Sequence, residues 1–269
     1  FHARVQAALK LRERLPLAQH TNAMRLVHGE SDGLPGLIVD RYADVLVAQF
    51  LSAGMERWRD SILDALVELT SCEAVFERSD AEVRTLEGLP DRAGFMRGNS
   101  DAARCAISEH GLTFRVDVAA GQKTGFFLDQ RANRLRVREI SAGRDVLDCF
   151  CYTGGFAIAS LAGGAREVVA IDSSGPAIAV ARENPPARAT VTRGMINGAD
   201  SATGSVRVRR SRAHRSRACF VVADAKSRSP RSASASCGSR SRRAAVRTGT
   251  TSALRRSGAV WAAFRVALL

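Results

Sequence analysis

The 269-residue sequence lacks any apolar run near the roughly 20 residues that a membrane-spanning helix needs. The chain opens with Phe1-His2-Ala3-Arg4, and no signal-peptide pattern follows. We therefore expect a soluble, cytoplasmic protein with no membrane contact. Since the first residue is not Met, we also expect that upstream sequence, including an N-terminal domain, is missing.

A metal-binding pattern is also lacking among the six cysteines. Only Cys149 and Cys151 lie close together, and no second cysteine pair or histidine cluster completes a zinc site with them. A cytoplasmic location argues against disulfides. We expect no metal, and buried, inert thiols for most of the cysteines.

Acidic residues are nearly absent from the last third of the chain. Residues 186–269 hold 17 Arg and 1 Lys against 2 acidic residues, a net charge of +16. This exceeds the +13 of the whole chain by 3, so residues 1–185 carry a net charge of −3. The Arg-, Ser- and Ala-rich composition predicts a disordered basic tail, in which only residues 218–224 and the last nine favour regular structure.

Apolar periodicity predicts a small α+β unit over residues 1–100. A helix is expected over residues 1–14, strands within 23–50, a helix over 55–69 and a strand at 74–76. This unit precedes a second pattern in which strands and helices alternate.

The second pattern covers residues 101–185 and predicts the first half of a Rossmann-like domain. Alternating strands and helices of this spacing build a parallel sheet covered by helices. The expected elements are a hairpin at 106–118, helices at 129–140, 155–162 and 174–183, and strands at 145–148 and 167–171.

The first candidate ligand site follows the strand that ends in Asp148 and runs into Gly154-Gly155. Glycines allow close backbone approach, and ligands of such sheets lie at the carboxyl ends of the strands. The G-x-G-x-x-G pattern that seats a pyrophosphate is absent. A carboxylate suits a cation, and S-adenosylmethionine carries an ammonium and a sulfonium. Asp148 therefore favours this cofactor, with a helix-capping role as the alternative.

Asp172 ends the next predicted strand, 24 residues after Asp148. An acidic residue about 20 residues further on is placed to accept hydrogen bonds from ribose hydroxyls. Alternatively, Asp172 caps the helix that begins near Ser174.

A third candidate segment runs from Gly121 to Arg131. Phe126 and Phe127, with Lys123 and Arg131 nearby, suit the wall of a cofactor or base pocket, although propensity alone would place both rings in the core. Asp129 is placed to cap the helix that begins near Gln130.

These runs carry a family resemblance. Residues 121–131, Asn133-Arg134 and residues 149–156 resemble the RlmI-like bacterial class I methyltransferases, which modify cytosine C5 of large-subunit (23S) ribosomal RNA. Residues 25–42 and 77–80 resemble the central domain of that family. The resemblance covers about residues 1–184, and the chain starts near where the family's N-terminal PUA domain ends. It implies S-adenosylmethionine as cofactor, ribosomal RNA as partner, and a cofactor-binding set of Lys123, Phe126, Asp129, Arg131, Asp148, Tyr152, Gly154 and Asp172.

The catalytic part of the family's pattern is not matched. The resemblance implies a cysteine thiolate that adds to C6 of cytosine, and a pocket-shaping Asp-Pro-Pro-Lys segment. The segment is absent, and Asp224-Ala225-Lys226, 52 residues after Asp172, comes nearest to it. Cys237 has a faint similarity to the catalytic cysteine motif, and Asp200 to an adenine-contacting position. No catalytic residue is assigned.

Two hypotheses explain the change of composition near residue 186: a shifted reading frame, or a basic tail that binds RNA phosphates. We interpret the sequence as an α/β protein with a small α+β RNA-facing domain at 1–100, half of a class I methyltransferase domain at 101–185 and a poorly matched or disordered segment at 186–269. The expected function is S-adenosylmethionine-dependent methylation of ribosomal RNA. The alternatives are a non-catalytic RNA-binding remnant and a nucleotide-dependent oxidoreductase.

Overall fold

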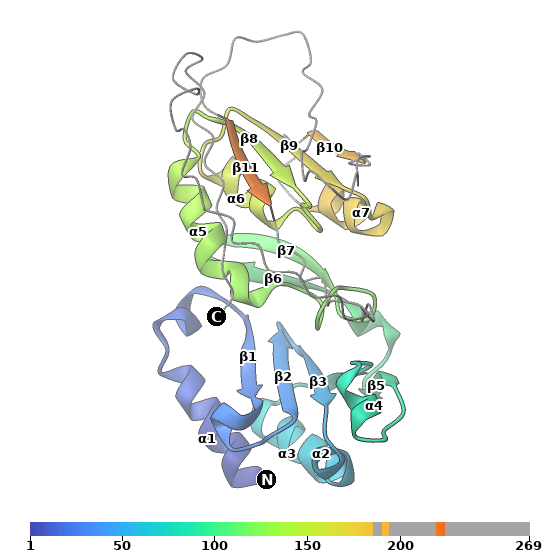
Figure 1. The fold of residues 1–269 in the computed structure, drawn as a ribbon. Coiled ribbons are helices and arrows are strands. Elements are labelled where there is room, and N and C mark those ends of the chain that lie inside the picture. The colour runs from blue at the N-terminus through green and yellow to red at the C-terminus, as the bar shows by residue number, and fades with distance from the viewer. Residues whose placement is uncertain (185–189, 194–218, 224–269) are drawn as a thin grey trace, which may run out of the picture.

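The computed structural model describes residues 1–184, 190–193 and 219–223, which form two sheets and a hairpin between them (Figure 1). Short 3-10 turns at Pro16–His20, Gly29–Asp32, Ser100–Ala103 and Leu128–Gln130 join some of the elements. The elements are α1 (His2–Glu13), β1 (Ala23–His28), β2 (Leu37–Tyr42), β3 (Val45–Phe50), α2 (Ala53–Arg57), α3 (Arg59–Thr70), β4 (Ala74–Ser79), α4 (Val83–Leu86), β5 (Arg92–Arg97), β6 (Arg104–Glu109), β7 (Leu112–Asp117), α5 (Arg131–Ile140), β8 (Asp145–Cys149), α6 (Gly155–Ala162), β9 (Glu167–Asp172), α7 (Gly175–Glu183), β10 (Thr190–Arg193) and β11 (Cys219–Ala223).

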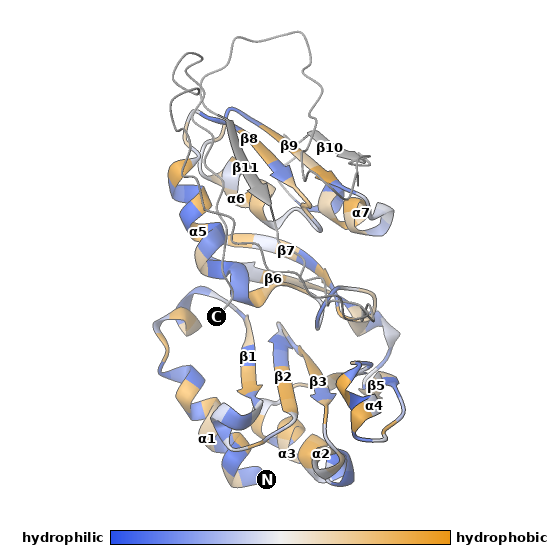
Figure 2. Ribbon diagram, viewed as in Figure 1, coloured by the Kyte–Doolittle hydropathy of each residue, from blue (hydrophilic) through white to orange (hydrophobic). Residues whose placement is uncertain are grey.

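The first sheet, called the central sheet here, has the order β1-β2-β3-β4-β5. Its neighbours are antiparallel except for β3 and β4, which α2 and α3 connect as a parallel crossover. Apolar side chains of α1 and α3, including Val5, Ile62 and Leu66, pack with Val39 and Leu46 of the strands. Figure 2 shows these strands as largely hydrophobic, with hydrophilic residues at the end of β2 that faces the hairpin.

A second apolar cluster joins the central sheet to the rest of the molecule. Tyr42 and Phe76 of the central sheet share this cluster with Ile107 and Phe114 of the β6–β7 hairpin and with Phe126, which follows the hairpin. The predicted division near residue 100 therefore separates two stretches of sequence that share one core. That the two stretches are separate domains stays a prediction.

The second sheet, called the parallel sheet here, has the order β10-β9-β8-β11 with all described neighbours parallel. The chain moves outward from β8 to β9 and β10, and β11 then pairs with the other edge of β8. This is the Rossmann strand order, and ligands of such sheets bind outside the carboxyl end of the strand where the order reverses. The fold thus points to the residues that follow β8.

The predicted helices and strands of residues 1–183 are confirmed, except that the helix expected over residues 55–69 is divided at Trp58 into α2 and α3. The Rossmann-like fold class is also confirmed. Sequence analysis missed α4, β5 and β10, whereas β11 lies in the stretch 218–224 that favoured regular structure. The rest of the 186–269 segment, where a disordered tail was expected, lies outside the described residues. Among the residues that are described, no helix is both long and apolar enough to span a membrane.

Candidate functional site

The loop that follows β8 has an unusual backbone. Phe150, Tyr152 and Gly154 have φ values of 63°, 51° and 77°, so every second residue adopts the left-handed conformation. Residues other than glycine rarely do so, and such conformations concentrate at functional sites. Gly154 is the N-cap of α6, where a side chain would be strained. The loop therefore bends sharply across the end of β8.

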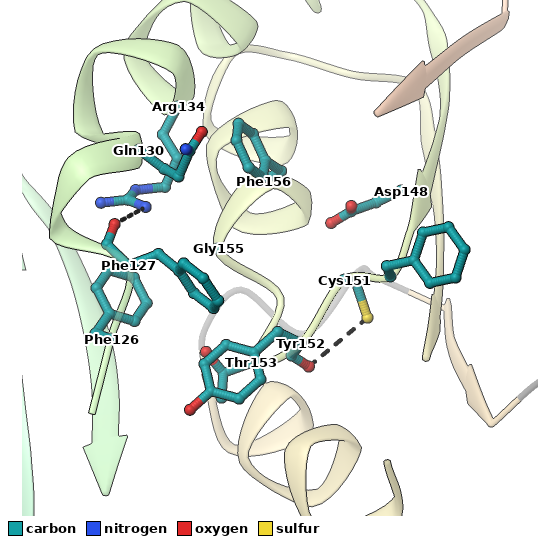
Figure 3. A pocket seen from close by; sticks show the side chains of 11 residues that line it. Phe126, Phe127, Gln130, Arg134, Asp148, Cys151, Tyr152, Thr153, Gly155 and Phe156 are labelled. Carbon is teal, nitrogen blue, oxygen red and sulfur yellow. Dashed lines mark hydrogen bonds between the residues drawn. The ribbon is translucent and has the colours of Figure 1, made fainter. Parts of the chain in front are cut away.

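A pocket lies between this loop, the start of α6 and residues 126–134 (Figure 3). Aromatic side chains form much of its lining, and the carboxylate of Asp148 is directed into it (Figure 3). The described lining residues are Phe126, Phe127, Gln130, Arg134, Asp148, Phe150, Cys151, Tyr152, Thr153, Gly155 and Phe156.

Asp148 is only 1% exposed and accepts a hydrogen bond at Oδ2 from the backbone N of Ala157, at 3.0 Å. Ala157 lies in the first turn of α6, whose positive end favours a carboxylate. Asp148 is thus not the N-cap of α6, which is Gly154, but its carboxylate both lines the pocket and binds the first turn of that helix.

Asp172 joins the loop after β8 to the end of β9. Its two oxygens accept hydrogen bonds from the backbone N atoms of Tyr152 and Ser174, both at 2.8 Å. The N-cap of α7 is Ser174, whose hydroxyl accepts from Ala177 N, so the alternative that Asp172 is the helix cap is wrong. Asp172 binds the backbone of the loop and is not among the described lining residues of the pocket.

Tyr152 connects the pocket to the segment that precedes η4 (Leu128–Gln130). Its hydroxyl accepts a hydrogen bond from Gln122 N at 2.8 Å and donates one to Gly125 O at 3.1 Å. Burial raises the pKa of the Tyr152 phenol, which keeps the donating proton in place. Its ring meets the ring of Phe127 edge-on at 5.5 Å, and the two rings form one wall of the pocket.

Lys123 and Asp129 form a pair beside this wall. The Lys123 ammonium lies 4.6 Å from the centre of the Phe127 ring and binds both Asp129 oxygens at 2.8 and 2.9 Å. Partial burial acts to raise the pKa of Asp129, but Lys123 holds it below its usual value. The expected capping by Asp129 is wrong, because the N-cap of α5 is Gln130 and no side chain bonds there.

Arg131 is not among the described lining residues of the pocket. Its Nε binds Glu109 Oε2 at 2.9 Å, and its terminal nitrogen donates to the carbonyl of Ala23 in β1. The structure therefore places this predicted cofactor-binding residue at the junction of α5, β6 and β1, where it links the central sheet to the hairpin.

Arg134 lines the pocket, but its guanidinium is already bound. It donates to Glu109 at 2.7 and 2.8 Å and to Phe127 O at 2.9 Å, and it lies 4.6 Å from the centre of the Phe126 ring. Sequence reasoning did not select Arg134 as a pocket residue. The sequence spacing could have indicated this position of Arg134. It follows Gln130, the N-cap of α5, by four residues, so the two side chains lie on the same side of the helix.

Two of the described cysteines, Cys105 and Cys151, are not activated nucleophiles. Burial and the nearby Asp148 carboxylate raise the pKa of the Cys151 thiol, and burial raises that of Cys105 to about 11. The sequence candidates for the catalytic part, Asp200, Asp224, Lys226 and Cys237, lie outside the described residues. No group of three or more potential metal ligands occurs in the described ranges.

Sequence comparison gives curated relatives over about two thirds of the chain. The chain is 44% identical over 184 residues to Ribosomal RNA large subunit methyltransferase I of Erwinia tasmaniensis, and 47% identical over 185 residues to that of Aeromonas hydrophila. Each alignment covers 68% of this chain but only 46% and 47% of the relative. The chain thus spans about half the length of the curated relatives it matches.

Structure comparison supports the same fold. A Streptococcus mutans protein assigned as an S-adenosylmethionine-dependent methyltransferase superposes with a TM-score of 0.62 at 23% identity, covering 72% of this chain and 52% of that one. A second solved structure, assigned as a methyltransferase and complexed with SAH, gives the same TM-score and identity and is covered over 51% of its length.

The family model described as S-adenosylmethionine-dependent methyltransferase matches residues 25–197. The match includes both segments that line the pocket and extends past residue 185, near which the composition changes. Because the match covers more than half of the sequence, the chain belongs to the family of S-adenosylmethionine-dependent methyltransferases.

Proposed function

We propose that this chain binds S-adenosylmethionine in the pocket at the end of β8 and is the cofactor-binding part of an enzyme that methylates ribosomal RNA. The observation that carries the proposal is the buried Asp148 carboxylate, which is directed into an aromatic pocket at the point where the strand order reverses. The names of the curated relatives support ribosomal RNA as the substrate.

The residues of the pocket fit a cationic cofactor. Among its described lining residues Arg134 is the basic side chain, and Glu109 already neutralises it, so little positive charge remains for a pyrophosphate. A carboxylate and aromatic ring faces both attract cations. When bound, S-adenosylmethionine supplies a methyl group on a positively charged sulfur.

Within this proposal, Asp148 faces a cationic group of the cofactor, while Phe126 and Tyr152 pack against it. Gly154 shapes the loop, and Asp172, which binds that loop through Tyr152 N, accepts hydrogen bonds from the ribose hydroxyls with its remaining lone pairs. Lys123 and Asp129 support the Phe127 wall. Arg131 is excluded from this set, since it is bound to Glu109 and Ala23.

The target atom and the cellular location belong to the same proposal. Cytosine C5 is the target that the sequence resemblance implies, and a cytoplasmic location follows from a ribosomal RNA substrate. The C5 reaction requires a thiolate nucleophile, and the raised thiol pKa values of Cys105 and Cys151 make these two cysteines unsuited to that role. We place this nucleophile outside the described residues.

Calorimetric titration with S-adenosylmethionine tests the cofactor. We expect the wild-type chain to bind and Asp148→Asn to bind on the order of a hundredfold more weakly, because a buried charge interaction is lost. Asp145→Asn is the matched control, since Asp145 opens the same strand and pairs with Arg166 at its far end. A folded wild-type chain that does not bind, or equal binding by Asp148→Asn, contradicts the proposal.

Transfer of labelled methyl groups to large-subunit ribosomal RNA then separates an enzyme from a non-catalytic RNA-binding remnant. Label in the RNA, lost in Asp148→Asn, supports the enzyme. Cofactor binding without transfer supports the remnant. Titration with a nicotinamide dinucleotide tests the oxidoreductase alternative, for which we expect no binding.

A further inference from the structure

Residues 121–127, called the pocket loop here, lie between the central sheet and the cofactor pocket. Phe126 and Phe127 line the pocket, and Tyr152 holds the loop from the pocket side through Gln122 and Gly125. The opposite side of the loop is held by residues of the central sheet, which do not line the pocket.

A directed chain of hydrogen bonds joins β2 to the pocket loop. Thr124 donates its hydroxyl proton to Asp40 Oδ2 at 2.6 Å, because a carboxylate only accepts. Tyr42 then donates to Thr124 Oγ1 at 2.7 Å and accepts from Phe126 N at 3.2 Å. Burial raises the pKa of Tyr42, so its hydroxyl stays a donor.

Asp40, the final acceptor of this hydrogen-bond network, is held in place by Arg25. Asp40, Tyr42 and Thr124 are all buried, and Arg25 binds the two Asp40 oxygens at 2.8 and 2.9 Å. Connected hydrogen bonds in a low-dielectric interior strengthen one another, and loss of one member leaves its neighbours unsatisfied. The position of Thr124 therefore depends on the central sheet.

Arg78 of β4 provides a second attachment. One of its terminal nitrogens donates to the carbonyls of Gly121 and Val118 at 2.9 and 3.1 Å. The backbone at Gly121 is so tightly folded that an added Cβ would lie 2.3 Å from Asp117 O and 2.6 Å from Gly125 O. Such a loop has little freedom to take another shape while these contacts hold.

We propose that Tyr42, Arg78 and Thr124 are positioning residues, through which the central sheet sets the shape of the cofactor pocket. They hold the pocket loop so that Phe126 and Phe127 stand as a preformed wall, and they do not touch the cofactor. The inference rests on the proposed binding of S-adenosylmethionine. It assigns to the central sheet a part in cofactor binding, in addition to any contact with RNA.

The test compares Thr124→Val and Arg78→Gln with Thr124→Ser and Arg12→Gln. Thr124→Ser retains the hydroxyl. Arg12→Gln is a matched control, because the Arg12 side chain is 12% exposed, like that of Arg78 at 13%, and binds Asp32 away from the pocket loop. Each variant is titrated with S-adenosylmethionine, and amide hydrogen exchange over residues 122–127 is measured without cofactor.

We expect Thr124→Val and Arg78→Gln to weaken binding on the order of tenfold, as expected for the loss of one charge-assisted hydrogen bond. Both should exchange faster over residues 122–127, whereas Thr124→Ser and Arg12→Gln should match the wild type in both measurements. If Thr124→Val does not fold, Arg78→Gln decides the question alone.

The possible failures are distinguishable. If the wild-type chain binds no S-adenosylmethionine, the proposed function fails and the inference fails with it. If the wild type binds and the folded Thr124→Val and Arg78→Gln variants bind equally well, only the inference is overturned. It is also overturned if Arg12→Gln weakens binding as much as Arg78→Gln, since the effect then follows general stability.

Discussion

The central sheet and the parallel sheet use their carboxylates differently. In the central sheet, Asp40 is bound by Arg25, and Glu77 by Arg59 at 3.1 Å. At the carboxyl ends of β8 and β9, where the parallel sheet borders the pocket, two carboxylates receive backbone amides: Asp148 receives Ala157 N, and Asp172 receives the amides of Tyr152 and Ser174.

The difference in binding partner separates carboxylates that stabilise the fold from carboxylates that are available to a ligand. A guanidinium cancels the charge of a buried carboxylate and fixes the two elements that carry the pair. A backbone amide orients a carboxylate and stabilises its ionised form without a full opposing charge. We infer that the central sheet is built to hold its shape, while the parallel sheet directs negative charge at the pocket.

Glu109→Gln should be the most destabilising of these changes. Glu109 binds both Arg131 and the buried Arg134, and its neutralisation leaves two guanidinium groups facing an amide. Breaking a buried ion pair costs about 3–5 kcal/mol of unfolding free energy. Urea denaturation measures the loss. A cost below about 1 kcal/mol would show that these charges are much better solvated than their burial indicates.

Asp172→Asn should mainly affect the cofactor. An asparagine oxygen can accept one of the two amide protons, and its NH₂ group then faces the other donor. We expect affinity for S-adenosylmethionine to fall on the order of tenfold, since a lost charge-assisted hydrogen bond is worth about 1.5–3 kcal/mol. Asp40→Asn is the contrasting variant, which should lower the melting temperature more. If Asp172→Asn and Asp40→Asn lower the affinity for S-adenosylmethionine equally and also lower the melting temperature equally, the proposed difference between the two sheets is wrong.

Acid should destabilise the junction between the two sheets through Glu109. Burial acts to raise the pKa of Glu109, but Arg134 and Arg131 hold it below its ordinary value. Its contribution to stability is therefore complete above the ordinary pKa of about 4.3 and is lost as the pH falls through the lower folded-state pKa. Unfolding free energies at pH 7 and pH 3 should differ more in the wild type than in Glu109→Gln. Parallel pH dependence in the two chains would exclude Glu109 as the cause.

Arg136→Ala should have the smallest effect. Arg136 pairs with Glu139 across one turn of α5, and both side chains are exposed. Such helix pairs contribute about 0.2–0.5 kcal/mol. Urea denaturation in parallel with Glu109→Gln should show this contrast between surface and buried charge, and a loss above about 1 kcal/mol would contradict it.

The sequence predicted those parts of the fold that have a strong apolar period. It missed β5, whose exposed and half-buried residues and Gly94 give no alternation, and β10, a strand of four residues in Arg-rich text. Periodicity reports burial, so an element that buries little is not visible to it.

The pocket position of Asp148 could be predicted because a local sequence pattern fixes its geometry. Asp148 ends a strand before paired glycines, and the structure directs its side chain into the pocket as that pattern indicates. Arg131 was misplaced because a cation beside aromatic residues has the same appearance in sequence whether it faces a ligand or a carboxylate. Its partners, Glu109 and Ala23, are 22 and 108 residues away, and only the tertiary fold brings them together.

Amide hydrogen exchange of the wild-type chain with and without S-adenosylmethionine tests the central claim most directly. The account predicts that the cofactor slows exchange in residues 121–127 and 150–157, which border the pocket, and leaves β1 and β3 unchanged. Slower exchange confined to the central sheet, or no change in either pocket segment while the cofactor is bound, would contradict a site at the end of β8.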